Sequence, residues 1–438
     1  MGAAPIQSKD PLSHLRVLDL TQFLSGPYAT QILGDLGADV IKIEPPIGDM
    51  TRDLPPYFVG SESAYFLSTN RNKRSVAIDL KMPEGQKLVS KLASTCDVVV
   101  ENFRPGVADR LGLQYEKIST ENPSLVWCSI SGFGQSGPYR DRPAYDMIVQ
   151  ALSGGMSLTG QPDGVPVRSG IPLGDLAAGM YGVIGILAAI EDSRRTGRGR
   201  LVDIAMLDCQ VAMLSYQAAY YLASGKVPER QGRAHDSIPT YRCFRSANDI
   251  DVVVTANTEK MWRSLCEVLE LSEFTDDPRF ANNELRYTNK NELWKILDRA
   301  FLARGADTWV ALLQAAGIPA AVVNTLDRSL NDPQVIHREM VLSMQADSGE
   351  IARVAGNPIK FYGMGNARAN YPPKLNADAD YVVRDMLGIS EEEYDRLKLA
   401  GVIGDRRASL PNAPLEQARH NDGQTAGPLT IPISAASG

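Results

Sequence analysis

The sequence is poor in the residues that build metal sites and disulfide frameworks. Its five cysteines lie far apart with no C-x-x-C pair, and its four histidines are scattered with no H-E-x-x-H spacing. A disulfide framework and a zinc site held by these residues are therefore both unexpected, and we expect no metal. The pattern is typical of a reducing compartment. We expect a cytoplasmic location, or the mitochondrial matrix if the natural protein carries a targeting peptide that this sequence lacks.

Excess basic charge is also missing. The chain has 45 Lys and Arg against 52 Asp and Glu, a formal net charge of −7, and no basic stripe, so a nucleic-acid partner is unexpected. The N-terminus, MGAAPIQSKDPLSH, lacks the apolar run of a secretory signal. One stretch, Ile171–Ile190, has the length of a membrane span. Asp175 near its start and its four glycines favour a buried core helix instead, so we expect no membrane partner.

What is present is an ordinary globular composition, 44% apolar and 22% charged, in a chain of 438 residues. Short β-rich runs alternate with helical spacing over the first 130 or so residues, which predicts an α/β fold with a parallel sheet covered on both faces. The predicted strands are Leu15–Leu20, Asp39–Glu44, Ser75–Leu80, Asp97–Phe103 and Ser124–Ile130, and the predicted helices between them are Gly26–Leu36 and Pro83–Ser94.

The rest of the chain suggests a second, smaller unit. From Pro172 to about Ala223 the pattern is mostly helical. We predict a Rossmann-like large domain whose first part is 1–223, a linker at 224–240, a smaller α/β domain at 241–326, a return to the large domain at 327–404, and a disordered tail at 405–438. The smaller domain is expected to hold a strand at Asp251–Ala256 and amphipathic helices such as Lys260–Leu269.

A glycine loop follows one predicted strand. Gly132-Phe-Gly134-Gln-Ser-Gly137 matches G-x-G-x-x-G, but Pro138 interrupts the helix that a dinucleotide fingerprint needs. The loop is better explained as a place where backbone approaches a ligand. Gly132, Gly134 and Gln135 are therefore candidates to stabilise an oxyanion through backbone N–H groups.

Asp175 is the most informative single residue. It stands in Gly-Asp-Leu-Ala-Ala-Gly at the start of the long apolar helix. It could be a plain N-cap, for which Asp is among the preferred residues. Alternatively, the positive potential of a helix N-terminus could keep a carboxylate ionised in a poorly hydrated place, where it could attack an acyl carbon.

Several motifs in fixed order resemble the class III CoA-transferases, the CaiB/BaiF family. They are LSGPYATQILGDLGADVIKIEPPIGDMTR, NRNKRSVAIDL, DVVVENFRPG, SGFGQSGP and GDLAAGMYG. The resemblance runs from about Leu15 to about Ile403. Two further runs, FVGSESAYFLSTNRNKRS and RAHDSIPTY, look closest to the succinyl-CoA:dicarboxylate branch.

The resemblance implies roles for particular residues. Asp175 falls on the family's nucleophile. The racemase branch carries a His-Asp pair upstream, where this chain has Tyr145-Asp146, and tyrosine is a poor proton acceptor near neutral pH, which favours transfer over epimerisation. The CoA contacts implied are Leu24, Ser25, Lys42, Ile43, Glu44, Asn70 through Arg74 (with Asn72 and Lys73), Asn102, Phe103 and Arg110. Each Lys or Arg taken alone equally fits a solvated surface charge.

A dicarboxylic acceptor would leave one carboxylate in need of a cationic partner. Arg52, Arg71 and Arg168 are the candidates, and His235 in the linker is either a substrate contact or a capping and hydrogen-bonding residue. A glycine-rich lid known from formyl-CoA transferase is matched here by Thr255-Ala-Asn257-Thr, which has no glycine run. A gating loop is therefore in doubt.

The implied activity is transfer of CoA from a donor such as succinyl-CoA to a mono- or dicarboxylic acid, through aspartyl anhydride and aspartyl-CoA intermediates. Coenzyme A is then a substrate, no cofactor is permanently bound, and the partner is a second copy in an interlocked homodimer. Two other functions stay open: a 2-methylacyl-CoA racemase, and a CoA-binding protein without chemistry.

Overall fold

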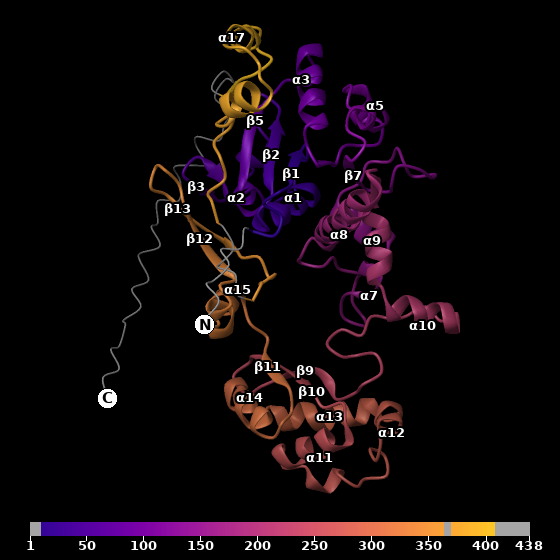
Figure 1. Ribbon diagram of the computed structural model, residues 1–438. Helices are drawn as coiled ribbons and strands as arrows, with labels where there is room; N and C mark the ends of the chain where they lie inside the picture. The colour runs from indigo at the N-terminus through magenta and orange to yellow at the C-terminus, as the bar shows by residue number, and fades with distance from the viewer. Residues whose placement is uncertain (1–9, 363–368, 408–438) are drawn as a thin grey trace, which may run out of the picture.

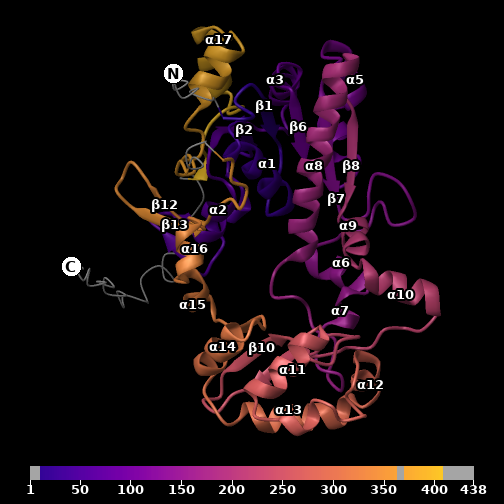
Figure 2. The ribbon, with the colours of Figure 1, turned by 60° about the horizontal axis from the view of Figure 1, so that its bottom comes forward.

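The computed structural model of the chain describes residues 10–362 and 369–407. Figure 1 shows a large unit above and a small unit below. The chain passes between them twice: it leaves the large unit after helix α10 (Tyr216–Ser224) and returns through α15 (Leu326–Leu330). Figures 1 and 2 place these two connections on opposite sides of the molecule.

The large unit is built on a six-stranded sheet of order β5-β2-β1-β6-β7-β8, in which every pairing is parallel. This confirms the predicted α/β class with a parallel sheet. The strands are β1 (Arg16–Asp19), β2 (Asp39–Glu44), β5 (Lys73–Ala77), β6 (Val98–Glu101), β7 (Val126–Ser131) and β8 (Leu201–Ala205). Strand β8 was not predicted, since its short run lies inside a region whose pattern is mostly helical.

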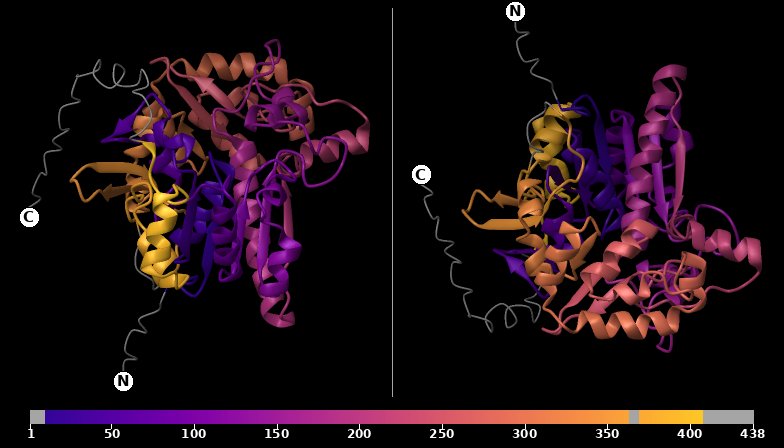
Figure 3. Two further views of the ribbon diagram at one scale, coloured as in Figure 1. Left: turned by 90° about the horizontal axis from the view of Figure 1, so that it is seen from above. Right: turned by 90° about the horizontal axis from the view of Figure 1, so that it is seen from below.

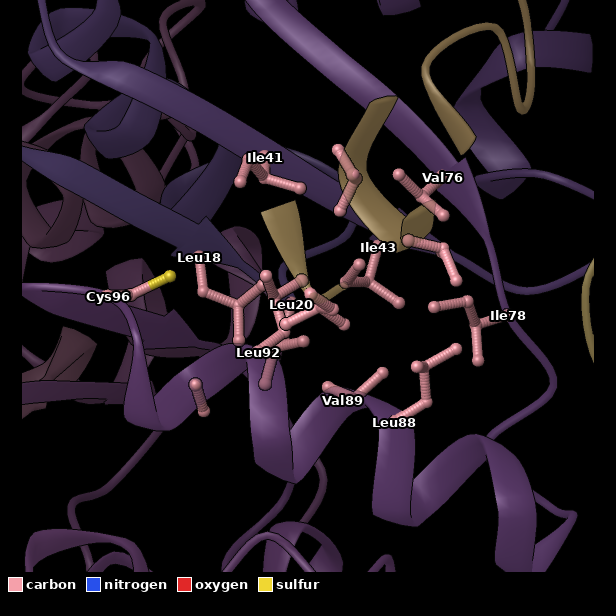
Figure 4. Close-up of a cluster of buried hydrophobic side chains, with 14 of the residues drawn as sticks. Leu18, Leu20, Ile41, Ile43, Val76, Ile78, Leu88, Val89, Leu92 and Cys96 are labelled. Carbon is pink, nitrogen blue, oxygen red and sulfur yellow. The ribbon is translucent and has the colours of Figure 1, made fainter. Parts of the chain in front are cut away.

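Both faces of the sheet are covered, which explains why the inner strands β2, β1, β6 and β7 are buried at almost every position. On one face, side chains of β1, β2 and β5 meet Leu88, Val89 and Leu92 of α3 (Pro83–Ser94) in a buried cluster (Figure 4). The same core includes residues of α5 (Tyr115–Glu121), η3 (Asp380–Met386) and α17 (Glu391–Leu399). The other face packs against α1 (Ser25–Asp35), α6 (Asp146–Leu152), α8 (Leu173–Thr196) and α9 (Met206–Met213).

Helix α8 is the helix predicted from the long apolar stretch. By length and composition alone it could span a membrane, and it is the one such helix in the part of the chain that the structure describes. Its inner face is buried against α1 and the sheet, with Ala177, Ala178 and Ile186 at most 1% exposed. A side chain at Gly179 would put its Cβ 2.7 Å from the Ser25 carbonyl oxygen, so glycine is needed for α1 to lie this close.

The small unit has its own core. Its antiparallel sheet has the order β11-β10-β9, from β9 (Tyr241–Arg245), β10 (Asp251–Thr255) and β11 (Ala320–Val322). The helical elements around it are α11 (Glu259–Val268), η2 (Ser272–Phe274), α12 (Asn283–Thr288), α13 (Lys290–Phe301) and α14 (Ala306–Ala315). Five tryptophan and phenylalanine side chains are fully buried in this unit: Phe244, Trp262, Phe280, Phe301 and Trp309. One strand of the three was predicted, and it ends one residue earlier than expected.

The returning chain completes the large unit. After α16 (Pro333–His337) and the hairpin β12–β13 (Val341–Gln345 and Ile351–Ala355), it runs along the free edge of β5. The Asn376 side chain accepts the Ala77 N–H (2.9 Å), and Asp378 accepts the Ser75 N–H (2.9 Å). Figure 3 shows the C-terminal helices beside the N-terminal strands. The predicted disordered tail lies, from residue 408 onward, outside the described residues.

Six shorter elements complete the description. They are η1 (Met50–Asp53), the small hairpin β3–β4 (Phe58–Val59 and Glu62–Ser63), α2 (Ala64–Thr69), α4 (Val107–Arg110) and α7 (Gly155–Leu158). Between α10 and β9 no helix or strand is assigned, and this stretch contains most of the predicted linker.

Candidate active site

Asp175 lies in the first turn of α8, but it is not the N-cap. That position belongs to Pro172, and Asp175 is the third helical residue. Its side chain is half-buried. Burial first, and the nearby Asp146 carboxylate second, raise the pKa of Asp175 to about 7. Both effects oppose the positive potential of the helix start, which by itself would favour the ionised carboxylate.

Asp146 sits beside the start of α8. Its Oδ1 accepts the backbone N–H of Gly174 at 2.7 Å, so this carboxylate supplies the cap that Pro172 lacks. Gly174 is wedged between the two helices: a Cβ there would lie 2.6 Å from Val149 of α6 and 3.1 Å from Asp146 Oδ1. Glycine before the candidate nucleophile is thus a packing requirement, and it lets α6 place a second carboxylate next to Asp175.

Tyr65 was missed by the sequence analysis. It lies on α2, whose N-terminus is capped by Ser63. Burial, and then the negative charges of Asp175, Asp49 and Asp146, raise the pKa of its phenol to about 12. The phenol therefore keeps its proton at neutral pH, within electrostatic range of Asp175. Nothing in the local pattern around Tyr65 could show this, since Asp175 lies 110 positions later in the sequence and comes within electrostatic range only through the fold.

Tyr145 is the N-cap residue of α6 and is 67% exposed. Its ring stands edge-on to Phe23, with centroids 6.2 Å apart. Phe23 has a φ of 64°, a left-handed backbone that aromatic residues rarely adopt, directly before Leu24 and Ser25. The turn between β1 and α1 therefore comes to the same side of the molecule as the start of α6.

Two predicted CoA-contacting segments are brought together at this turn. The Asn102 side chain accepts the Gln22 N–H (2.9 Å) and donates to the Gln22 carbonyl (2.7 Å). Leu24 is half-buried, and Ser25 is buried. Phe103 is held by its backbone N–H, which donates to Glu101 at 2.8 Å. Burial raises the pKa of Glu101 to about 7.

The two lysines predicted to bind phosphates point inward instead. Lys42 is 1% exposed, pairs with Asp49 (2.9 Å) and donates to the Thr21 carbonyl (2.7 Å). Lys73 donates to Asp19, the Pro27 carbonyl and Asn70, all between 2.9 and 3.0 Å. Burial lowers the pKa of Lys73 to about 8 in spite of the attraction of Asp19. Because both ammonium groups are buried and paired with protein groups, they do not face a ligand in this structure.

The neighbouring predicted residues are similarly occupied. Asn70 is fully buried and donates to the Phe66 carbonyl (3.0 Å). Asn72 donates to Asp35 (2.8 Å) and accepts from the Asn370 N–H (2.9 Å). Ile43 is 5% exposed, and Glu44 is paired with Arg52. Arg74 is half-exposed and pairs with Asp39 (2.8 Å) and Asp378 (3.3 Å).

The three candidate arginines for a second carboxylate differ. Arg52 is fully buried and grips both oxygens of Glu44 at 2.7 Å. Arg71 is 2% exposed and holds both oxygens of Asp35, at 2.8 and 2.6 Å. Both are therefore committed to protein carboxylates, a correction to their predicted role. Arg168 is exposed and makes a weak hydrogen bond to the Ser169 carbonyl (3.3 Å).

Arg110 is exposed and lies near an arginine that the sequence analysis did not single out. A Cβ built on Gly106 would lie 3.4 Å from Arg110 Nη1 and 3.5 Å from Arg140 Nη2. The two guanidinium groups therefore lie close together beside Gly106. Arg140 also donates to the Gln135 carbonyl (2.9 Å) and pairs with Asp141 (3.0 Å). This brings two cations beside the Asn102–Phe103 segment.

Two of the three residues predicted to bind an oxyanion in the glycine loop have N–H groups that are already used. The Gly134 N–H donates to Ser131 Oγ, and the Gln135 N–H donates to Asp203, both at 2.9 Å. Gly132 packs so closely against Ala144 that a Cβ would lie 2.3 Å from it. The loop therefore holds the segment that leads into Tyr145, and its two central donors are already satisfied.

His235 lies between two aromatic rings. It stacks on Tyr241 (5.3 Å between centroids) and Tyr216 (6.1 Å), and its Nδ1 accepts the Ser237 N–H at 3.2 Å. These contacts fit the hydrogen-bonding role rather than a place beside Asp175. The Thr255–Thr258 stretch ends β10 and caps α11 through Thr258. In residues 10–362 and 369–407, no cluster of His, Cys, Asp or Glu could hold a metal.

Known proteins resemble the chain over most of its length. The profile of CoA-transferase family III matches residues 12–379. A human succinyl-CoA:glutarate CoA-transferase is 39% identical over 394 residues, 90% of this chain and 90% of that protein. An acetyl-CoA:oxalate CoA-transferase of Acetobacter aceti is 40% identical, over 82% of this chain and 91% of that protein. The crystal structure of a CaiB/BaiF family protein from Brucella suis superposes with a TM-score of 0.78 at 37% identity, covering 87% of this chain and 100% of that one.

These matches show an enzyme that moves coenzyme A between acyl groups. The chain belongs to CoA-transferase family III, the family that its motifs resemble, and this confirms the predicted enzyme class.

Proposed function

We propose that the enzyme transfers CoA from a small acyl-CoA, such as succinyl-CoA, to a dicarboxylic acid, with Asp175 as the nucleophile. The relatives named for succinyl-CoA, glutarate and oxalate support this substrate class. The observation that carries the choice of nucleophile is a half-buried carboxylate at a helix start, beside a second carboxylate and a protonated tyrosine.

The reaction runs through four acyl transfers. The ionised Asp175 oxygen attacks the thioester carbonyl of the donor, the C–S bond breaks, and CoA departs as a thiolate. The product on the enzyme is a mixed anhydride between Asp175 and the donor acyl group. The thiolate then attacks the aspartyl carbonyl, which releases the donor acid and forms an aspartyl-CoA thioester. The acceptor carboxylate attacks this thioester and expels CoA thiolate, giving a second anhydride. Attack of the thiolate on the acceptor's acyl carbon yields the new acyl-CoA and frees Asp175.

The environment of Asp175 suits this role. A carboxylate with a pKa near 7 is a stronger nucleophile than one near 4, and about half of it is ionised at neutral pH. Each tetrahedral intermediate carries an oxyanion. Since the Gly134 and Gln135 N–H groups are used within the loop, the protonated phenol of Tyr65 is our candidate donor.

Coenzyme A would bind along the β1–α1 turn and the Asn102–Phe103 segment. Leu24, Ser25 and Phe103 offer apolar surface and backbone, while Arg110 and Arg140 offer charge to the phosphates. Lys42, Asn70 and Lys73 support the turn from beneath. Arg168 is the candidate that keeps a guanidinium exposed for the second carboxylate of the acid.

The assembly that we propose is a homodimer, interlocked through the space between the two units. Helices α8, α9 and α10 expose a row of large apolar side chains: Met180, Tyr181, Ile184, Leu187, Val211, Met213, Tyr216, Tyr220, Tyr221 and Leu222. Exposed apolar side chains gathered on neighbouring helices mark interaction surfaces in many proteins. The two connections on opposite sides of the molecule give the chain the open form that threading needs (Figure 2).

For a compartment we propose the cytoplasm or the mitochondrial matrix. All five cysteines are free; four of them are buried, and Cys243 is half-buried. Burial raises the pKa of Cys96 to about 12 and of Cys209 to about 11, so these two thiols stay protonated and unreactive. Thiols of this kind fit a reducing environment.

A substrate screen with trapping tests the proposal. Succinyl-CoA, acetyl-CoA and formyl-CoA are each offered with a panel of mono- and dicarboxylates, and new acyl-CoA is read by mass spectrometry. Hydroxylamine should convert the acylated side chain to a hydroxamate at residue 175 only when acyl-CoA is present. Asp175→Asn should abolish both signals while acyl-CoA still binds.

The alternatives give different results. A racemase would exchange the α-proton of a 2-methylacyl-CoA for deuterium in heavy water. A binding protein without chemistry would produce no new acyl-CoA with any pair. Full turnover by Asp175→Asn would refute the assigned nucleophile while leaving the family intact.

A further inference from the structure

Gln150 on α6 is a buried glutamine whose amide nitrogen and amide oxygen are both hydrogen-bonded, the nitrogen to Asp146. It is 3% exposed. Its Nε2 donates to Asp146 Oδ2 at 2.7 Å, and its Oε1 accepts the backbone N–H of Ser169 at 2.9 Å. The amide orientation follows from chemistry: a carboxylate can only accept, and a backbone N–H can only donate.

These bonds form one chain that ends at the helix start. The Ser169 N–H binds Gln150, Gln150 binds one oxygen of Asp146, and the other oxygen of Asp146 binds the Gly174 N–H at 2.7 Å. Gly174 directly precedes Asp175. Both carboxylate oxygens of Asp146 are thus held by hydrogen bonds. The segment from Ser169 to Gly174 is held at both ends, through the backbone N–H of its first and last residues.

Packing leaves this chain little freedom. Val149, next to Gln150, is fully buried and lies against Gly174, where even a Cβ would come within 2.6 Å. Ser169 Oγ in turn accepts the Ile171 N–H at 3.2 Å. A buried amide that bonds a half-buried carboxylate and a half-buried backbone group at once is an orienting element, because losing either bond would leave an atom of the buried amide unpaired.

We infer that Gln150 is a positioning residue for acylation of Asp175, acting through the Asp146 carboxylate that it orients against the first turn of α8. The inference rests on the proposed function. It explains why the position carries an amide. A carboxylate at 150 would face Asp146 acceptor to acceptor, and an apolar side chain would leave one oxygen of Asp146 and the Ser169 N–H without partners.

The test exchanges the two functional groups. Asp146→Asn alone turns an amide donor toward Gln150 Nε2, and Gln150→Glu alone sets two acceptors face to face. In the double variant D146N/Q150E the series of hydrogen bonds from Ser169 to Gly174 is restored, with the donor and acceptor exchanged in the bond between positions 146 and 150. The new amide at position 146 accepts from Gly174 and donates to the new carboxylate at position 150, which also accepts from Ser169. The net charge is that of the wild type.

The expected result is that each single change lowers kcat by about tenfold or more, with the KM for acyl-CoA unchanged within about twofold, and that the double variant recovers most of the loss. Melting temperature is measured alongside. Gln150→Met should lose activity as the singles do. Gln210→Met, which removes a buried glutamine of α9 whose Nε2 has no hydrogen-bond partner, should stay within about threefold of wild type.

Losses in kcat that multiply in the double variant overturn the inference, even if the melting temperature recovers, because Gln150 would then be structural only. Single variants with wild-type kcat also overturn it. Hydroxylamine trapping separates these outcomes from failure of the proposed function. If the wild type gives no adduct at residue 175, the nucleophile is wrong. If it does and the exchange fails, only the role of Gln150 is lost.

Discussion

The large unit holds buried carboxylates in two opposite ways. At the ends of β1, β2 and β5, Asp19 is matched by a cation: burial alone would raise its pKa, but Lys73 and Lys42 hold it well below its usual range. At the start of α8, Asp175 lies near the Asp146 carboxylate, no cation among the described residues offsets the effect of burial, and the pKa of Asp175 rises. The difference teaches that buried carboxylates paired with cations belong to the scaffold here, while the carboxylate with the raised pKa is the one that we propose as the nucleophile.

A substitution at the buried Asp19–Lys73 pair should give the largest effect on stability. Asp19→Asn leaves the buried ammonium of Lys73 without its counter-charge, so we expect a loss of about 3–5 kcal/mol in the free energy of unfolding. Chemical denaturation at pH 7 measures it. The folded-state pKa of Asp19 is depressed, so its contribution is present above the unfolded value of about 4 and is lost as pH falls further. A loss below about 1 kcal/mol would contradict the pairing.

At the start of α8 we expect a substitution to stabilise the protein rather than destabilise it. Asp175 has a raised pKa, so the folded protein resists its ionisation, and stability is lost as pH rises from about 4 to about 7. Asp175→Asn should therefore be more stable than the wild type at pH 8, by about 1–2 kcal/mol after allowance for solvent, and show little difference at pH 4. Thermal melts at the two pH values test this, and destabilisation at pH 8 would count against an unpaired carboxylate.

The effect of the Asp146 charge on Asp175 should appear in the dependence of kcat on pH. The proposed mechanism needs ionised Asp175, so we expect the profile to fall on the acid side near pH 7. Asp146→Asn removes a negative charge that raises this pKa. The acid limb should therefore move to lower pH, by about half to one unit, even though the height of the profile drops. Measurements of kcat across the neutral range, on both sides of this limb, test the shift. An unmoved limb would mean that burial alone sets the pKa.

The smallest effect concerns the cations. Arg110 is exposed and, among the residues that the structure describes, pairs with no carboxylate, unlike the buried Arg52. Arg110→Ala should raise the KM for acyl-CoA about five- to tenfold and leave kcat nearly unchanged, with the difference shrinking at high salt. Arg263→Ala on the small unit, also an exposed arginine, is the matched control. Equal behaviour of the two variants would remove Arg110 from the CoA site.

Sequence patterns predicted the class of fold and the place of Asp175, because continuous apolar strands and a glycine-flanked carboxylate are local features. They could not predict that Lys73 would meet Asp19, which lies 54 positions away, or that Lys42 would turn inward. A lysine in a motif looks the same whether it faces solvent or a buried aspartate. Tyr65, Arg140 and Gln150 were missed for the same reason: their partners come from other elements.

The pairing of the C-terminal return with β5 has a consequence for how the protein is made. The outer N–H groups of this strand are taken by Asn376 and Asp378, about three hundred residues later in the chain. Until the ribosome has released that segment, the nascent sheet has an open side able to recruit strands from other molecules. A product truncated before Asn376 should therefore aggregate, even though Asp146, Asp175 and all six strands of the parallel sheet are already present.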